Sequence, residues 1–235
     1  VASAVSYYFI EQPLRTGGGR RALAGAASLY VSSLVLALIV LGGQGFPARI
    51  DAQVANIAAY SSYDHRGLFR SRVCFLDPDQ RAREINLTTC LPGNAGIVLW
   101  GDSHIAQFSH GLQIFLAHRN IVLGQLTASA CPPIVGLSIP ARPNCEEFND
   151  RVIALLVQRK PETVVLGAVW TGAPTQLVAL DRTIAMLTGA GIKVVVLGPA
   201  PIFKQPVPTI LARRMQSGDP TMAAGPDMET VVFDR

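Results

Sequence analysis

Charge is scarce in this sequence, and the usual signatures of metal and nucleic-acid binding are missing. Asp, Glu, Lys and Arg make up 15% of the 235 residues, and the net charge of +4 is not gathered in a long basic run. Nucleic-acid binding therefore has little support. There is no Cys-x-x-Cys pair, and none of the four histidines is spaced to complete a zinc site. We therefore expect neither a metal nor another cofactor.

Apolar residues, in contrast, are abundant. They form 49% of the chain, and a mean hydropathy of +0.33 indicates a chain that is part membrane and part globular. Residues 22–43, "ALAGAASLYVSSLVLALIVLGG", carry no charge. A helix of this length spans the ~30 Å hydrocarbon core, and its serines can bond to carbonyls one turn earlier. A cleaved signal peptide is the alternative, but the length and the amphipathic stretch before the segment argue against it.

The charges around residues 22–43 predict the orientation of the segment. Arg15, Arg20 and Arg21 precede it, and no basic residue follows until Arg49. By the positive-inside rule the N-terminal flank faces the cytoplasm. We therefore expect a protein of the inner, cytoplasmic membrane whose residues after 43 lie in the periplasm or outside the cell.

All four cysteines follow the predicted membrane segment. Cys74, Cys90, Cys131 and Cys145 form an even set in an oxidising compartment, which predicts two disulfides. Four cysteines allow three pairings. Proximity along the chain favours Cys74–Cys90 and Cys131–Cys145, and each bond would close a loop worth about 3 kcal/mol in the chain-entropy model.

The chain divides into four predicted parts: residues 1–21, 22–43, 44–92 and 93–235. The first ends a helix, closed by Gln12-Pro13, and continues as a basic, glycine-rich loop. The third is an irregular linker and cap. The fourth alternates strands (96–100, 120–129, 161–170 and 192–201) with helices (103–119, 145–160 and 174–191). This alternation predicts an α/β fold with a parallel sheet covered on both faces.

Ser103 directly follows the first strand of that sheet, in the run "VLWGDSHIAQF". Reactive groups gather at the carboxyl ends of parallel strands, where Ser129, Trp170 and Pro199 also fall. Unpaired backbone N–H groups at the start of the next helix can receive the oxygen of a tetrahedral acyl intermediate, which favours acyl transfer if a base reaches the serine. Asp102 is expected to hold the turn by accepting backbone N–H bonds. The alternative is that "GDSH" is only a helix cap.

The strand end "GIVLWGDSH" resembles the first block of the SGNH hydrolase and esterase superfamily. The ordered blocks "CFLDPDQ", "TTC", "GIVLWGDSHIAQF", "LTASACPPI", "NCEEFND", "VVLGAVW" and "AGIKVVVLGPAPIF" look like the extracytoplasmic SGNH domain that is fused to type-3 membrane acyltransferases. The opening "SYYFIEQPLR" is similar to the tail of that acyltransferase domain. The resemblance implies a three-layer, flavodoxin-like SGNH domain preceded by a transmembrane helix.

The resemblance also implies a function. The membrane domain would carry an acyl group, usually acetyl, across the bilayer, and the SGNH domain would pass it to a hydroxyl of a cell-envelope polysaccharide such as lipopolysaccharide. Ser103 would be the nucleophile. Its N–H and a group near Ser129-Ala130 would form the oxyanion hole, supported by Asp102, while Trp170 and Thr171 stand where the superfamily usually has an asparagine. The implied partners are the membrane-embedded acyltransferase domain, the polysaccharide acceptor and the lipid bilayer.

The catalytic base is the main departure from the superfamily, which uses an Asp-x-x-His block near its C-terminus. No such block occurs here. His104 is expected to point away from the serine beside it, His110 and His118 to be surface or packing residues, and His65 to lie in the linker without a catalytic role. The final "METVVFDR" resembles the beginning of a fifth strand. The sequence is therefore interpreted as a fragment, nearly inert alone, of an O-acyltransferase.

Two other functions stay open at this point: a non-catalytic carbohydrate-binding or scaffolding module, and a secreted esterase. The proline-rich run "PAPIFKQPVPTILARR" (199–214) either lines a substrate groove or is a plain loop, and the plain loop is the simpler interpretation.

Overall fold

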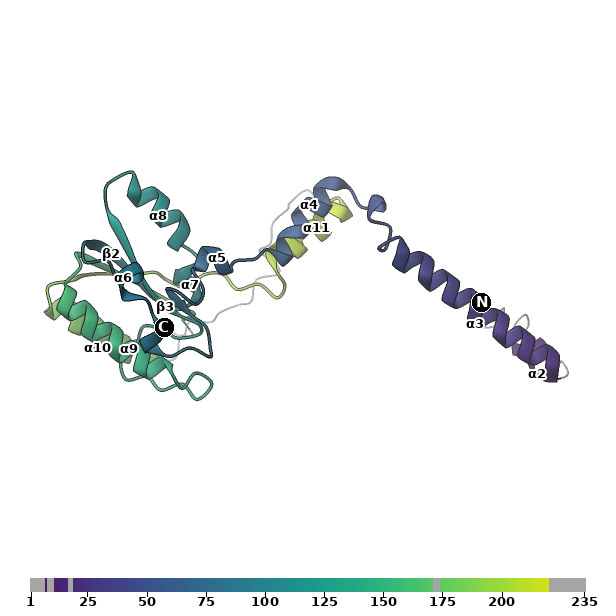
Figure 1. Cartoon of the computed structure of the whole chain (residues 1–235), viewed down its shortest axis with the longest axis horizontal. Coiled ribbons are helices and arrows are strands. Elements are labelled where there is room, and N and C mark those ends of the chain that lie inside the picture. The colour runs from purple at the N-terminus through teal and green to yellow at the C-terminus, as the bar shows by residue number, and fades with distance from the viewer. Residues whose placement is uncertain (1–6, 8–10, 17–18, 171–173, 220–235) are drawn as a thin grey trace.

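The computed structural model of the chain describes residues 7, 11–16, 19–170 and 174–219. Its centre is a sheet of five parallel strands in the order β1-β3-β2-β4-β5 (Figure 1). The strands are β1 (Phe75–Leu76), β2 (Ala95–Gly101), β3 (Val122–Ala128), β4 (Thr163–Gly167) and β5 (Lys193–Val196). The predicted parallel α/β fold is confirmed.

Helices cover both faces of the sheet because the central strand β2 is apolar on both. Its Val98 and Trp100 pack with the buried side of α9 (Cys145–Arg159) and with α10 (Pro174–Gly189). Leu99, which points the other way, packs under α7 (Ser103–Ala106) and α8 (Ser109–Ala117). Alternating side chains on a strand point to opposite faces, so one apolar run supplies two cores and the domain has three layers.

Polar side chains inside the larger core are hydrogen-bonded to each other. The indole N–H of Trp100 donates to Asn149 Oδ1 at 3.0 Å, and Asn149 Nδ2 donates to the carbonyl oxygens of Pro132 and Ile134. All of these groups are buried, and satisfied polar groups are tolerated in a core. This network joins β2, α9 and the loop that follows β3.

Both disulfides favoured by proximity are present and the pairing is confirmed. Cys74–Cys90 links the residue before β1 to α6 (Leu87–Cys90), and Cys131–Cys145 links the end of β3 to the first residue of α9. All four cysteines are buried. The second bond lies two residues beyond Ser129, at the same end of the sheet as Ser103.

The region between residues 44 and 92 is more regular than predicted. It holds three short 3₁₀ helices (Pro47–Arg49, Tyr60–Ser62 and Ala82–Glu84), the helices α4 (Ala52–Ala59), α5 (Arg66–Phe69) and α6, and the strand β1. β1 pairs with β3, and the Ser129 N–H donates to the carbonyl of Leu76 at 2.9 Å. A two-residue strand is too short for a periodic signal, so the sequence did not reveal it.

Residues 103–119 form two helices where the sequence pattern predicted one. α7 ends at Ala106 and α8 begins at Ser109, whose hydroxyl donates to the carbonyl of Leu68 at 2.9 Å. Phe108 and Phe115, two of the apolar residues at helical spacing in this segment, are about half exposed. The polar contact of Ser109 with the preceding region decides where α8 begins.

The plain-loop interpretation of residues 199–214 is wrong over its second half. α11 (Val207–Ser217) forms there and packs against α4, whose Val54 is buried. The hydroxyls of Ser61 and Thr209 lie 2.9 Å apart. Pro208 does not prevent the helix because proline is tolerated in the first turn. Figure 1 shows α4 and α11 side by side between the sheet domain and the long helix α3.

The helix α3 (Gly19–Gly42) contains the predicted membrane segment. Residues Leu23–Gly42 are long and apolar enough to cross a bilayer, and none is buried in the protein. Ser33 donates to the carbonyl of Leu29 at 2.8 Å, which satisfies its hydroxyl inside the helix. Before it, α2 (Gln12–Thr16) begins where a helix was expected to end, and Gly19–Arg21, expected in a loop, belong to α3. The predicted final strand, residues 228–235, lies outside the described residues.

We expect Gly101→Ala to destabilise the protein severely. Gly101 has φ 148°, and a Cβ there would overlap the carbonyl oxygen of Gly167 on β4. Overlap with backbone cannot be relieved by a rotamer change, so the free energy of unfolding should fall by about 3 kcal/mol or more. Chemical denaturation measures the change.

Gly111→Ala is the matched control for this substitution. Gly111 lies in α8, and a Cβ there meets nothing within 4 Å. Alanine should stabilise the helix by about 0.5–1 kcal/mol. Equal effects of the two substitutions would contradict the tight contact between β2 and β4.

Candidate functional site

Ser103 stands at the carboxyl end of the central strand. In the sheet register Gly101 is level with Thr127 of β3 and with Gly167 of β4. Two residues beyond these three positions are Ser103, Ser129 and Val169, which therefore emerge at one edge. Ser103 is the first residue of α7 and is partly exposed. The structure thus brings the predicted nucleophile to the same edge as Ser129-Ala130, the pair expected to contribute to the oxyanion hole.

Asp102 stabilises this edge of the sheet by accepting two backbone hydrogen bonds. The buried carboxylate accepts the His104 N–H through Oδ1 at 2.7 Å and the Val169 N–H through Oδ2 at 2.8 Å. The expected bonding to backbone N–H groups is present, and its second partner lies 67 residues away. Burial raises the pKa of the carboxyl, while the two N–H bonds oppose that shift. Asp102 therefore fixes the turn that carries Ser103 to the end of β4.

Two backbone N–H groups near the serine are free to donate. Within the described part of the chain, the N–H groups of Ser103 and Ala130 form no hydrogen bond, whereas the N–H of Ser129 is taken by the carbonyl of Leu76. Ala130 is exposed and has φ 48°, a left-handed conformation that turns its N–H away from the β3 ladder. Of the two residues expected near the oxyanion hole, it is therefore Ala130, not Ser129, whose backbone N–H is free to donate to an oxyanion.

Trp170 has a different environment from the one an oxyanion donor needs. It is buried, and its indole N–H donates to the carbonyl of Leu197, just beyond β5, at 2.6 Å. This bond ties the end of β4 to the end of β5. For Trp170 to stabilise an oxyanion the bond would have to break, so that role stays a prediction. Thr171 lies outside the described residues.

The four histidines do not supply a base for Ser103 in the described structure, where no histidine bonds to its hydroxyl. His65 contacts the ring of Phe69, and His110 and His118 are exposed on and after α8. His104 is half-buried, and its Nδ1 atom is buried without a hydrogen-bond partner. No cluster of three or more His, Cys, Asp or Glu that could hold a metal is found among the described residues.

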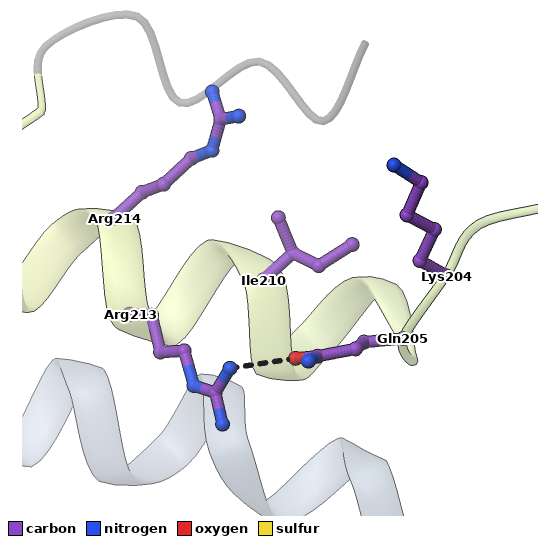
Figure 2. A pocket seen from close by; sticks show the side chains of 5 residues that line it. All are labelled: Lys204, Gln205, Ile210, Arg213 and Arg214. Atoms are coloured by element: carbon purple, nitrogen blue, oxygen red, sulfur yellow. Dashed lines mark hydrogen bonds between the residues drawn. The ribbon is translucent and has the colours of Figure 1, made fainter. Parts of the chain in front are cut away.

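A groove opens beside His104. It has a volume of about 490 Å³ and is lined on its other side by the proline-rich segment 201–207. A second pocket of about 350 Å³ is lined by Lys204, Gln205 and three residues of α11 (Figure 2). The two share Lys204 and Gln205 and therefore adjoin. The sequence had offered substrate binding as one role for this segment, and its prolines were the signal.

The fold and the position of the serine together define a class of protein. It is a parallel α/β domain with a serine just after its central strand, at the carboxyl edge of the sheet. Residues 73–231 match the family described as the SGNH domain fused to AT3 domains. This is more than half of the chain, and the chain belongs to that family.

A solved structure supports the fold. The chain is similar to the periplasmic domain of a lipopolysaccharide acetyltransferase from Salmonella ser. Paratyphi A, with 19% identity and a TM-score of 0.56. The match covers 71% of this chain and 65% of that one, so the chain spans about two-thirds of that domain. No curated protein matches the chain.

We expect Asp102→Asn to destabilise the protein even though it preserves shape. The amide has one acceptor oxygen, so its NH₂ group would face one of the two backbone N–H groups that the carboxylate now accepts. An unpaired buried donor should lower the free energy of unfolding by about 1–3 kcal/mol. Thermal or urea unfolding measures it.

Asp64→Asn serves as the comparison. Asp64 is exposed and accepts one N–H, from Arg66, which an amide oxygen also accepts. Its effect should stay within about 0.5 kcal/mol. If both variants are equally stable, the two-partner role of Asp102 is refuted.

Proposed function

We propose that this protein is part of an O-acyltransferase that carries an acyl group, most simply acetyl, on Ser103 and passes it to a polysaccharide of the cell envelope. The observation that carries the proposal is the placement of Ser103 at the carboxyl end of the central strand in a chain of the SGNH family. The family description names fusion to AT3 domains, which supports a membrane acyltransferase domain as the donor partner.

The proposed reaction has two balanced steps. The Ser103 hydroxyl oxygen attacks the acyl carbonyl, the bond from that carbon to the donor breaks, and the serine proton leaves through a base to the departing group. A glycan hydroxyl then attacks the acyl-serine, its proton passes to the base, and Ser103 regains a proton as it departs. The N–H groups of Ser103 and Ala130 are the proposed donors to the oxyanion, because both are unengaged at this edge.

The base is part of the proposal too. Because none of the four histidines bonds to the Ser103 hydroxyl in the described structure, we propose that the base comes from outside the part of the chain that the structure describes. A positioned general base contributes about 10²–10⁴ in rate. The chain by itself is therefore proposed to be nearly inert.

The location follows from the same features. The apolar helix Leu23–Gly42 would cross the inner membrane, with Arg15, Arg20 and Arg21 on its cytoplasmic side. The two disulfides suit an oxidising compartment on the other side. This arrangement would hold Ser103 close to a donor domain in the same membrane and argues against a freely secreted esterase.

A non-catalytic carbohydrate-binding module is the second candidate. The lack of a bonded base at Ser103 favours it, because the fold would then serve only to hold a glycan. The two candidates differ in one chemical property: a catalytic SGNH domain accepts an acyl group on Ser103, and a binding module does not.

We expect Ser103 to become acylated when a small base replaces the missing one. The chain is incubated with p-nitrophenyl acetate, with and without imidazole, and intact-protein and peptide mass spectrometry locate the acetyl group. Imidazole should raise acetylation of Ser103 at least tenfold, since it can enter beside the half-exposed serine.

Ser103→Ala in the same imidazole provides the background. Exposed serine hydroxyls elsewhere on the chain, such as those of Ser62 and Ser138, report non-specific acetylation. Acetylation of Ser103 at no more than their level would favour the binding module, and rapid Ser103-dependent turnover without imidazole would show that the base is already present.

A further inference from the structure

The groove beside the proposed acyl site is lined by cations. Besides His104, its ionisable lining residues among those the structure describes are Lys204, Arg213 and Arg214, and none of the described Asp or Glu residues lines either of the two adjoining pockets. Arg214 forms an ion pair with Asp219, which reduces the contribution of Arg214 to the positive potential of the groove. Arg213 donates to the neutral side chain of Gln205 at 2.7 Å and so keeps its full charge. The described lining of the two pockets therefore carries a net positive charge.

The groove is elongated and leads away from Ser103. It begins at His104, the neighbour of Ser103, runs along segment 201–207 and continues onto α11. From Val207 to Arg214 the helix alone rises by about 10 Å. Figure 2 shows Lys204 and Arg214 extending to the same side of α11, with Ile210 between them, while Arg213 turns toward the neighbouring helix. Such a shape suits a chain-like ligand better than a single small ion.

Apolar residues separate the charges. Pro201, Ile202, Phe203 and Pro206 line the part next to His104. Carbohydrate rings have apolar faces and hydroxyl edges, and binding pockets combine apolar walls with a few placed polar groups. Lys204 and Gln205, at the junction of the two pockets, provide a cation and an amide that can bond to an acidic group and to hydroxyls.

We propose that this groove binds an anionic glycan, one that carries carboxylate or phosphate groups, and that Lys204 is the residue that selects the charge. That this glycan is the acyl acceptor rests on the function proposed above. The groove would place a hydroxyl of the glycan near Ser103 while an acidic group farther along the glycan contacts Lys204. A membrane surface is the competing ligand because α4 and α11 lie between the sheet domain and α3 (Figure 1). The cations line a hollow that starts at the neighbour of Ser103, which favours the glycan.

The test compares two probes with the same sugar backbone, one with free carboxylates and one with these groups methyl-esterified and neutral. The full chain in neutral detergent micelles is titrated with hexagalacturonate and with its fully methyl-esterified form, and calorimetry gives the affinities. The acidic hexamer should bind at least tenfold more tightly, and added salt should reduce that advantage because the interaction is electrostatic. Equal affinities for the two hexamers would overturn the proposal.

A charge series at Lys204 assigns the effect to the groove. Lys204 is exposed, so its substitution should not disturb folding. Lys204→Gln should weaken binding of the acidic hexamer about fivefold and Lys204→Glu tenfold or more, with little change for the esterified form. Lys193→Gln is the matched control: Lys193 is also exposed, but it begins β5 at the opposite edge of the sheet. Equal losses from Lys193→Gln and Lys204→Gln would overturn the assignment.

Two further measurements distinguish a glycan-binding groove from a lipid-binding one and from a failure of the proposed acyl transfer. Micelles containing phosphatidylglycerol test the membrane alternative: if Lys204→Gln weakens lipid association and leaves hexamer binding unchanged, the groove is a lipid site and the proposal is wrong. Ser103→Ala should bind the acidic hexamer as the unmodified chain does. If binding of the acidic hexamer depends on Lys204 but Ser103 is never acylated, the anionic-glycan groove is supported and the proposed acyl transfer is wrong. If Ser103 is acylated but the two hexamers bind equally, the proposed acyl transfer is supported and the anionic-glycan groove is wrong.

Discussion

The site depends on one carboxylate that holds two strand ends together. Asp102 accepts one N–H from the helix it starts and another from Val169, beyond β4, and the Asp102 N–H itself donates to the carbonyl of Gly167. The backbone contact requires a glycine at position 101. These bonds fix the turn from which Ser103 projects, so the position of the proposed nucleophile is set by strand packing and by buried hydrogen bonds, not by the serine itself.

The neighbouring strand ends are fixed by other bonds of the same kind. The Cys131–Cys145 disulfide secures the chain just after Ala130, and the Trp170 indole bond to Leu197 joins the ends of β4 and β5. Rigid strand ends with free N–H groups between them are what an acyl-serine site needs. Among the described residues no proton acceptor bonds to the Ser103 hydroxyl, so the bonds that position Ser103 are separate from any group that would activate it.

The sequence allowed the sheet domain to be predicted because its signals are local. Apolar runs revealed β2, β3, β4 and β5, the spacing of Phe148, Val152 and Leu156 revealed α9, and closeness along the chain was enough to pair the cysteines. It failed for β1, whose two residues pair only because β3 offers an edge, and for α11, which forms against α4. Those elements depend on partners far away in the chain.

The same division holds for the site. By itself the sequence determined that Ser103 follows a buried strand, that Asp102 begins a turn and that a long apolar helix precedes both, because each of these is written in neighbouring residues. Only the tertiary structure decided that Ala130 rather than Ser129 offers its N–H, that the Trp170 indole is engaged, and that Lys204 reaches the groove beside His104. Hydrogen-bond partners and grooves form where segments far apart in the sequence pack together, and the local sequence does not show which segments will do so.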